Sequence, residues 1–333
     1  MAGLPTTVRR DLVVMGASAG GVDALTTILR GLPRELGASV VVVQHRPANA
    51  LPHLIELLRR ETRLPISWVE QGGPHEHDHV YLAPPDLHVT FSDGHFNLTA
   101  SAKENYARPS INRLFRSAAA HYGSRTLGVL LTGMLDDGVA GLVAISRVGG
   151  GTIVQDPDTA LAPELPRNGL SAVPTSRVVP LDRIARSIVD ASRESAPSLP
   201  IPEDVRLESE ADKHASLPED LDRFAERATV TCDECGGPLW RLPGPGPLRF
   251  RCYLGHAMSA TDRLERYHGE AEAAMWSAVR ALNERGATFE SLGVEARQHG
   301  DPAAALEFEQ NARSAFEQAT LAYDFVTRLM SRR

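Results

Sequence analysis

The sequence contains very little cysteine, with only three such residues among 333, at positions 232, 235 and 252. Three cysteines cannot all pair within one chain, and their spacing favours a metal site over a disulfide framework. The chain also lacks any run of about 18 apolar residues, so no transmembrane helix and no membrane insertion are expected. The apolar stretch DLVVMG near the N-terminus is too short for the core of a signal peptide. We therefore expect a cytoplasmic protein.

An excess of positive charge is missing as well. The chain has 35 basic and 42 acidic residues and a formal net charge of -7. No nucleic-acid partner is expected, because phosphate binding needs a basic face. The 333 residues, 42% of them hydrophobic, are enough for one large α/β domain and a smaller appendage.

Short apolar segments of strand length alternate with helical patterns over the first part of the chain. This alternation predicts an α/β fold with a mostly parallel sheet that helices cover on both faces. The domain should end near residue 190. Strands are predicted at residues 11–15, 39–43, 66–69, 79–82, 87–91, 126–131 and 152–154, and helices at 22–29, 50–60, 110–121 and 139–147.

The remaining residues have a different composition. Residues 191–230 are rich in acidic residues and proline, which predicts an acidic linker that is poorly ordered in part. Over 261–333, apolar residues recur at near-heptad spacing in two stretches separated by Gly-Asp-Pro at 300–302. This pattern predicts a helical hairpin, which either packs only on itself or offers a surface for self-association.

A glycine-rich turn follows the first predicted strand. Residues 16–21, GASAGG, would place Ser18 at the carboxyl edge of the sheet, where open α/β sheets keep their sites. Residues 16–20 also fit the G-x-S-x-G pattern of a nucleophile elbow, in the strand–turn–helix context that this pattern requires. A dinucleotide-binding turn is the alternative, but its G-x-G-x-x-G spacing is absent.

Two further strands are each followed by polar residues. His45 comes directly after the strand at 39–43, and a histidine there can take a hydroxyl proton and return it to a leaving group. Asp136 and Asp137 follow the strand at 126–131, and either carboxylate could orient the histidine. Both aspartates could instead cap the next helix.

Six segments resemble, in order, the motifs of the catalytic domain of CheB-type chemotaxis protein-glutamate methylesterases. They are GASAGG, VVVQHRP, VYLAPPDLHV, RPSINRLFRSAA, LLTGMLDDGVAGL and VQDPDTA…PRNGL, and they cover residues 11 to about 185. The resemblance implies a three-layer α/β/α doubly wound fold for a catalytic domain at residues 1–190. It also implies hydrolysis of glutamate methyl esters on the cytoplasmic helices of methylated chemoreceptors, and deamidation of certain glutamines, without a catalytic cofactor.

The same resemblance assigns roles to individual residues. Ser18 would be the nucleophile, His45 the base and Asp137 the acid of a catalytic triad. The backbone N–H of Met134 would belong to the oxyanion hole. Arg108, in the segment RPS, matches a family arginine near the site and would contact the substrate.

The sequence departs from the family pattern at three single positions and in its domain content. Ala19 stands where a threonine often follows the nucleophile, Leu135 where glycine is common, and Asn112 where aspartate is common. Members of the family ordinarily carry a phosphoacceptor receiver domain, whereas the first strand predicted here starts near Asp11. The expectation is therefore that aspartyl phosphorylation within this chain is not its switch.

The cysteines form a second motif with His256. Cys232, Cys235, Cys252 and His256 have the spacing C-x2-C and C-x3-H, which suits a tetrahedral zinc site of three sulfurs and one nitrogen. The segments GGPLW and LRFRCYLGH look like strands of a zinc ribbon. Residues 231–260 are therefore predicted to form a zinc-ribbon-like module with a structural zinc, and a metal-free module with reduced cysteines is the alternative.

Three functions stay open from the sequence. The first is an esterase that acts on methylated receptor glutamates. The second is an esterase that uses the same site on a protein outside chemotaxis. The third is a signalling adaptor with an esterase fold, whose C-terminal module binds a protein partner.

Overall fold

The computed structural model describes residues 7–46, 53–212 and 216–330. The chain divides into two compact units, Met1–Asp262 and Arg263–Arg333. Within the described ranges, no helix combines the length and the apolar character that crossing a bilayer requires.

The first unit is built around a seven-stranded sheet in which every neighbouring pair of strands is parallel. The strand order reverses beside the first strand of this sheet: the chain builds outward on one side of it and then returns to its other side. Ligand sites in open α/β sheets lie at the carboxyl ends of the strands at such a reversal. In spatial order the strands are β10 (Arg177–Val179), β9 (Gly151–Gln155), β8 (Thr126–Leu130), β2 (Leu12–Ala17), β3 (Ser39–Gln44), β5 (Val80–Leu82) and β4 (Ile66–Trp68).

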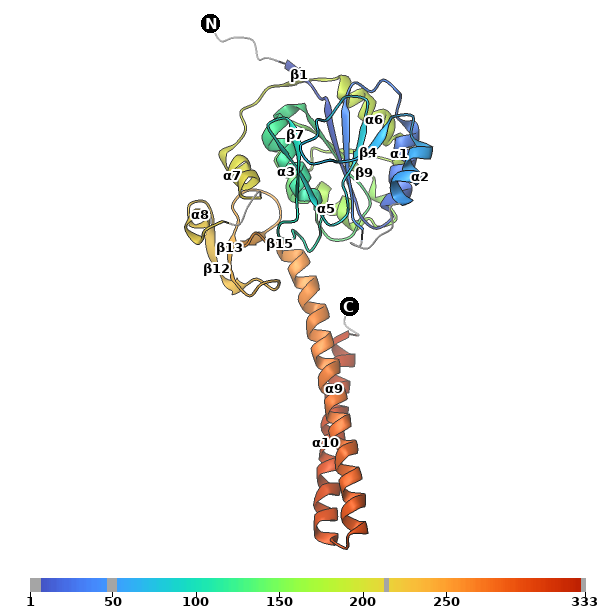
Figure 1. Ribbon diagram of the computed structural model, residues 1–333, viewed down its shortest axis with the longest axis vertical. Helices are drawn as coiled ribbons and strands as arrows, with labels where there is room; N and C mark the ends of the chain where they lie inside the picture. Colours follow the sequence, from blue (N-terminus) through green and yellow to red (C-terminus); the bar gives the residue numbers. More distant parts are fainter. Residues whose placement is uncertain (1–6, 47–52, 213–215, 331–333) are drawn as a thin grey trace. The chain divides into compact units, whose positions relative to one another are not determined.

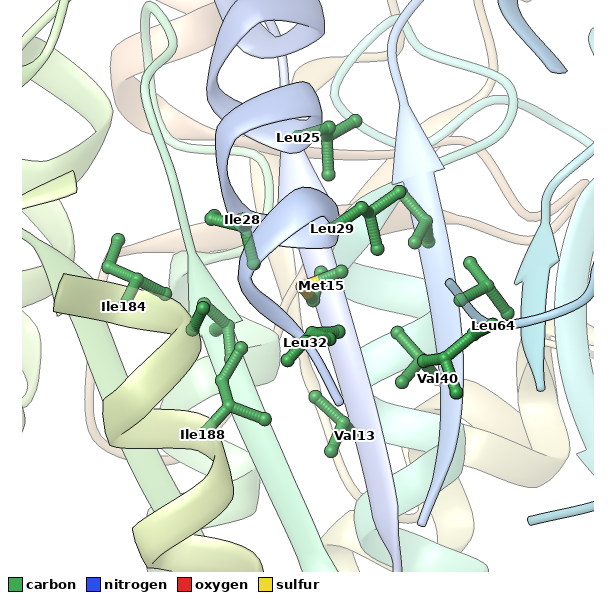
Figure 2. Close-up of a cluster of buried hydrophobic side chains, with 14 of the residues drawn as sticks. Val13, Met15, Leu25, Ile28, Leu29, Leu32, Val40, Leu64, Ile184 and Ile188 are labelled. Carbon is green, nitrogen blue, oxygen red and sulfur yellow. The ribbon is translucent and has the colours of Figure 1, made fainter. Parts of the chain in front are cut away.

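Helices cover both faces of this sheet. Alternate side chains of β2 point to opposite faces, so Val13 and Met15 belong to one core and Leu12 and Val14 to the other. Figure 2 shows Val13 and Met15 beneath helix α1 (Gly21–Gly31), with Ile184 of α6 beside them. The first face is covered by α1, α2 (His53–Glu61) and α6 (Leu181–Arg193), and the second by α3 (Ile111–Tyr122), α4 (Val139–Arg147) and α5 (Glu164–Ala172).

The three-layer α/β/α fold expected from the sequence is therefore confirmed. Each strand predicted in this part has a counterpart, although the segment at 87–91 became β6 (His88–Ser92), which pairs with β7 (His95–Thr99) in a separate hairpin. Residues 50–52 of the helix predicted at 50–60 lie outside the described residues. The elements α5, α6 and β10 were not predicted from the sequence.

The described part of 191–230 differs from the linker predicted there. β11 (Ser195–Pro197) pairs with β1 (Thr7–Arg9), and α7 (Glu203–Ala211), α8 (Pro218–Asp222) and β12 (Glu226–Thr231) follow. An acidic residue of this segment makes a buried contact. Asp212, directly after α7, accepts hydrogen bonds from Arg116 Nε on α3 at 2.8 Å and from Arg251 Nη1 at 2.7 Å. Burial opposes ionisation of Asp212, but Arg116, Arg113 and Arg251 together hold its pKa below the ordinary value.

The cysteine-bearing segment forms a four-stranded antiparallel sheet of β12, β13 (Pro238–Arg241), β14 (Arg249–Cys252) and β15 (Ala257–Ser259). The small sheet thus begins at residue 226, inside the segment predicted as a linker. It belongs to the same compact unit as the parallel sheet, so the structural unit extends well past the predicted boundary at 190.

The second unit is a helical hairpin, as Figure 1 shows. α9 (Ala260–Gln298) and α10 (Pro302–Met330) are joined by a short turn in which Gly300 has a φ of +79°. Trp276 contacts Tyr323, and Phe289 stacks on Phe308. The apolar repeat is interrupted near Arg285 because Phe316 packs where Gly286 has no side chain; a Cβ there would lie 2.6 Å from the Phe316 ring.

Candidate active site

Ser18 lies at the carboxyl end of β2, beside the reversal of strand order. Its N–H donates to the carbonyl of Thr132 at 3.0 Å, which ties the turn to the loop after β8. The turn depends on glycine: Gly20 has a φ of +76°, and a Cβ on Gly21 would lie 1.9 Å from Gln44 Oε1. The sharp turn places Ser18 just before the N-terminus of α1.

His45 follows β3 and lies between Ser18 and Asp137. Its Nδ1 is 3.2 Å from Ser18 Oγ, and its Nε2 is 2.7 Å from Asp137 Oδ2. Because Nε2 faces a carboxylate, it carries the proton of the neutral ring and donates it, which leaves Nδ1 to accept from the Ser18 hydroxyl. The Gln44 amide donates to the carbonyls of Ser18 and His45 at 2.8 and 3.0 Å and so fixes both backbones.

Asp137 is buried and accepts several hydrogen bonds besides the one from His45. Its carboxylate accepts from Ser110 Oγ at 2.8 Å, from the Ile111 N–H at 2.8 Å and from the Asn112 N–H at 3.1 Å. These donors form the N-terminus of α3, where backbone N–H groups stabilise a negative charge. The adjacent Asp136 binds other partners, so of the two aspartates it is Asp137 that reaches the histidine.

The backbone N–H of Ala19, the residue directly after Ser18, and that of Met134 make no hydrogen bond to another residue that the structure describes. Gly133 brings the Met134 loop close to the serine, since a Cβ on Gly133 would lie 3.0 Å from Ser18 Cβ. Free backbone amides beside a nucleophile can stabilise an oxyanion. The role of Met134 in an oxyanion hole stays a prediction, and Ala19 is a second candidate, because the elbow pattern assigns one donor to the residue after the nucleophile.

A cavity of about 400 Å³ adjoins His45. Three cationic side chains line it, Arg46, Lys103 and Arg108, against one carboxylate, Asp86. Arg108 is held in place, because its Nε donates to Asp86 Oδ1 at 2.9 Å and its Nη1 donates to the carbonyls of Ala100 and Ser101. The structure thus places Arg108 in the wall of this cavity.

The part of the chain that carries this site matches a known protein family. Residues 13–188 match the family model described as CheB methylesterase. The chain belongs to the CheB methylesterase family.

Individual members of the CheB family and one solved structure resemble the same part of the chain. The protein-glutamate methylesterase/protein-glutamine glutaminase 2 of Anaeromyxobacter dehalogenans is 38% identical over 185 residues, which is 56% of this chain and 54% of that protein. Protein 3 of the same name from Burkholderia orbicola is 39% identical over 186 residues, 56% of this chain and 55% of that protein. The chain thus spans about half the length of these curated relatives.

The crystal structure of the Thermotoga maritima CheB methylesterase catalytic domain has a TM-score of 0.53 and 32% sequence identity to this chain. The structural match covers 55% of this chain and 99% of the Thermotoga maritima domain.

Two departures from the CheB pattern acquire a structural meaning. Leu135 has a φ of +60°, a left-handed backbone that glycine adopts more easily than leucine, which accounts for the usual glycine. The side-chain Oδ1 of Asn112 accepts from the N–H groups of Gly138 and Gly141 at 3.0 and 2.8 Å, as an aspartate oxygen could. Its amide also donates to Asn105 Oδ1 at 3.4 Å, which an ionised aspartate could not do.

The predicted zinc ligands gather at one point, outside the residues that match the CheB family model. The ligand atoms of Cys232, Cys235, Cys252 and His256 all lie within 4.8 Å of one another. The Cys235 and Cys252 sulfurs are 3.7 Å apart, and Cys252 Sγ is 3.5 Å from His256 Nδ1. A tetrahedral zinc with bonds of about 2.3 Å to sulfur requires edges of about 3.8 Å, so the donor set fits this ion.

The thiols of this cluster interact strongly. The hydrogen bond with Cys252 and burial raise the pKa of Cys232 to about 12, and the same hydrogen bond lowers the pKa of Cys252. Residues 75–79 hold three further histidines close together in the sequence. His75 contacts Tyr122, His79 contacts Ser67, and His77 lies 3.6 Å from Asp11. These three side chains have separate partners and do not form one metal site.

Proposed function

We propose that this member of the CheB family is a serine hydrolase that demethylates glutamate methyl esters and deamidates glutamines on signalling proteins. The observation that carries the proposal is His45 bridging Ser18 and Asp137 at the reversal of strand order. The names of the relatives, protein-glutamate methylesterase/protein-glutamine glutaminase, support the same chemistry.

The geometry supports a two-step reaction. Ser18 Oγ attacks the ester carbonyl while His45 Nδ1 takes its proton, and Asp137 stabilises the imidazolium. The amides of Ala19 and Met134 stabilise the oxyanion. His45 then gives this proton to the leaving methoxide oxygen, so that methanol departs and the glutamyl-serine ester forms. A water takes the place of the methanol, and the same histidine activates the water to hydrolyse this ester. No step requires a cofactor.

The charges around the cavity support an acidic protein substrate. Arg46, Lys103 and Arg108 face a region next to His45 where the neighbours of the target glutamate would lie. Methylated cytoplasmic helices of chemoreceptors, which carry such glutamates, are the substrate that we propose, with a cytoplasmic site of action. Arg108 is proposed to act mainly by fixing the cavity wall, because its guanidinium already binds Asp86 and two carbonyls.

The test is methanol release from methylated receptor membranes incubated with the purified full chain. Wild-type protein should release methanol and Ser18→Ala should not. Ser187→Ala is the matched control, because Ser187 lies on α6 on the other side of the sheet from α3. Failure of the wild-type protein on receptor membranes, together with hydrolysis of a small glutamate methyl ester, would favour an esterase that acts outside chemotaxis.

We further propose that Cys232, Cys235, Cys252 and His256 bind a structural zinc, because their donor atoms lie close enough together to coordinate one ion.

We also propose that the helical hairpin binds a protein partner or a second copy of the chain. Several large apolar side chains are exposed on it, namely Leu264, Tyr267, Val294, Leu306, Leu321, Tyr323 and Phe325. Sedimentation of the full chain and of a chain ending at residue 262 compares their oligomeric states directly.

A further inference from the structure

Asp136 is a buried carboxylate next to the triad acid, and the proposed mechanism does not use it. It accepts hydrogen bonds from Ser259 Oγ at 2.7 Å and from Asn105 Nδ2 at 3.0 Å. Ser259 is the last residue of β15 in the ribbon. The loop that carries Met134 and Asp137 is therefore joined, through Asp136, to a strand more than a hundred residues further along the chain.

Asp262 completes this contact. It lies just after Ser259 in the first turn of α9, where its N–H donates to Ser259 Oγ at 3.0 Å. Its carboxyl is buried, accepts from Asn105 Nδ2 and hydrogen-bonds to Asp136. Two carboxyls can share such a bond only when one of them is protonated. Burial and the charge of Asp136 raise the pKa of Asp262 to about 9, so Asp262 is the donor.

We propose that Asp136, Ser259 and Asp262 are positioning residues, through which the ribbon end of the chain holds the catalytic loop in its active geometry. The inference rests on the proposed function of Ser18, His45 and Asp137, and adds a dependence of that site on Ser259 and Asp262, which lie outside the matched family segment. None of the positioning residues lies within the triad or the cavity lining given above.

The loop has a physical need for such support. It leaves β8 and must present the Met134 N–H and the Asp137 carboxylate to the same reacting centre, with Leu135 between them in a left-handed conformation. A bulky residue adopts that conformation only when surrounding contacts hold it. Asn168 Nδ2 donates to the Leu135 carbonyl at 2.9 Å, and Asp136 supplies the next anchor. Loss of this anchor would let the loop move, and displacements near 1 Å lower rates by about 100-fold.

The test compares three substitutions in the full chain. Asp262→Ala removes the donor to Asp136, and Asp262→Asn replaces the protonated carboxyl by an amide that can still donate. Ser259→Ala removes the hydroxyl donor. Glu265→Ala is the control, since Glu265 is an exposed carboxylate on the same helix. For each protein, kcat and KM for receptor-membrane methyl esters are measured together with the rate at which a fluorophosphonate labels Ser18, which does not depend on the substrate.

We expect Asp262→Ala and Ser259→Ala to lower kcat and the labelling rate by about 10-fold or more, with KM changed less than about 2-fold. Asp262→Asn should restore both to within about 3-fold of wild type. Folding is checked by circular dichroism, and if Asp262→Ala does not fold, Ser259→Ala and Asp262→Asn decide the matter. The inference is overturned if folded Asp262→Ala and Ser259→Ala keep wild-type rates, or if Asp262→Asn loses as much as Asp262→Ala.

Three outcomes of the labelling and hydrolysis measurements separate this inference from the proposed function. A wild-type protein whose Ser18 does not react removes the proposed nucleophile, and the positioning role with it. A reactive Ser18 without hydrolysis of receptor methyl esters removes only the substrate. Equal labelling of wild type and both donor-deleted variants removes only the positioning role.

Discussion

At the scale of single residues, the triad depends on the different surroundings of two adjacent aspartates. Asp137 accepts hydrogen bonds from backbone N–H groups at the start of α3 and faces His45. Asp136 accepts hydrogen bonds from Asn105 and Ser259 instead. The sequence alone could not separate them, because both follow the same strand. The separation depends on partners that come from other parts of the chain.

The first prediction concerns Asp137. In Asp137→Asn the amide cannot accept the Nε2 proton as the carboxylate does, so the histidine loses its tautomer and its counter-charge. Ester hydrolysis should fall by about 1,000-fold or more, as for other triads. Stopped assays of methanol release measure the rate, with Asp158→Asn as a control at an exposed acid. Wild-type turnover in Asp137→Asn would remove Asp137 from the mechanism.

The second prediction concerns pH. The pKa of Asp262 is raised to about 9 by burial and by Asp136, with Asp137 acting in the same direction. Between the ordinary carboxyl pKa near 4 and this value, the folded protein holds a proton that the unfolded chain releases. The free energy of unfolding should therefore fall as pH rises through this window.

Asp262→Asn removes this titration, so its stability should fall less steeply. The difference between the two proteins should change by about 1–2 kcal/mol between about pH 6 and about pH 8, measured by urea unfolding. Asp136, Asp137 and Glu164 are the other acids near this pair, and they are present in both proteins. Parallel pH curves would show that Asp262 is ionised in the folded state.

At the scale of elements, the ion pairs of α7 explain why a supposed linker is ordered. Arg116 on α3 is only 2% exposed and pairs with Glu104, Glu208 and Asp212. Removal of one member of a buried pair leaves the others without compensation, and this costs about 3–5 kcal/mol. We therefore predict that Arg116→Met lowers the free energy of unfolding by about this amount in urea titrations, whereas Arg186→Met, at an exposed pair on α6, changes it by less than about 1 kcal/mol.

The buried sheet and its helices could be predicted from sequence because their apolar patterns are local. Runs such as residues 39–43 are apolar throughout, as strands buried on both faces must be. The residues after 191 could not be predicted, since an acidic segment looks solvated until its buried arginine partners are known. Arg113 and Arg116 lie about a hundred positions before Asp212, and no local pattern connects them.

The ribbon provides a prediction about metal. Purified protein should hold about one zinc per chain, and Cys235→Ser should lose it. Because β15 pairs with β14, which carries Cys252, chelation should disorder Ser259 and slow the labelling of Ser18. Metal analysis and the fluorescence of Trp240, which is buried in the ribbon, follow the loss. Full labelling rates after complete removal of zinc would show that the ribbon holds Ser259 without the metal.

At the scale of the whole molecule, the parallel sheet and the ribbon belong to one compact unit that ends at Asp262, and the hairpin forms a second unit. A chain ending at residue 190 would lack Asp212 and Ser259 and leave the buried arginines of α3 with Glu104 as their remaining acidic partner. We predict that residues 1–262 fold and retain activity on small methyl esters, whereas residues 1–190 unfold at lower urea or aggregate. Equal stability of the two truncated chains would contradict the contacts described for α7 and β15.

The central claim is that Ser18 forms a covalent glutamyl ester during hydrolysis. The most direct measurement adds hydroxylamine to the reaction of the full chain with a glutamate methyl ester peptide. Hydroxylamine should intercept the glutamyl-Ser18 ester and yield the glutamyl hydroxamate, with free Ser18 restored and one methanol released for each peptide consumed. Ser18→Ala should give no more hydroxamate than the peptide alone. Enzymatic release of methanol without any enzyme-dependent hydroxamate, or hydroxamate formation that persists in Ser18→Ala, would contradict this account.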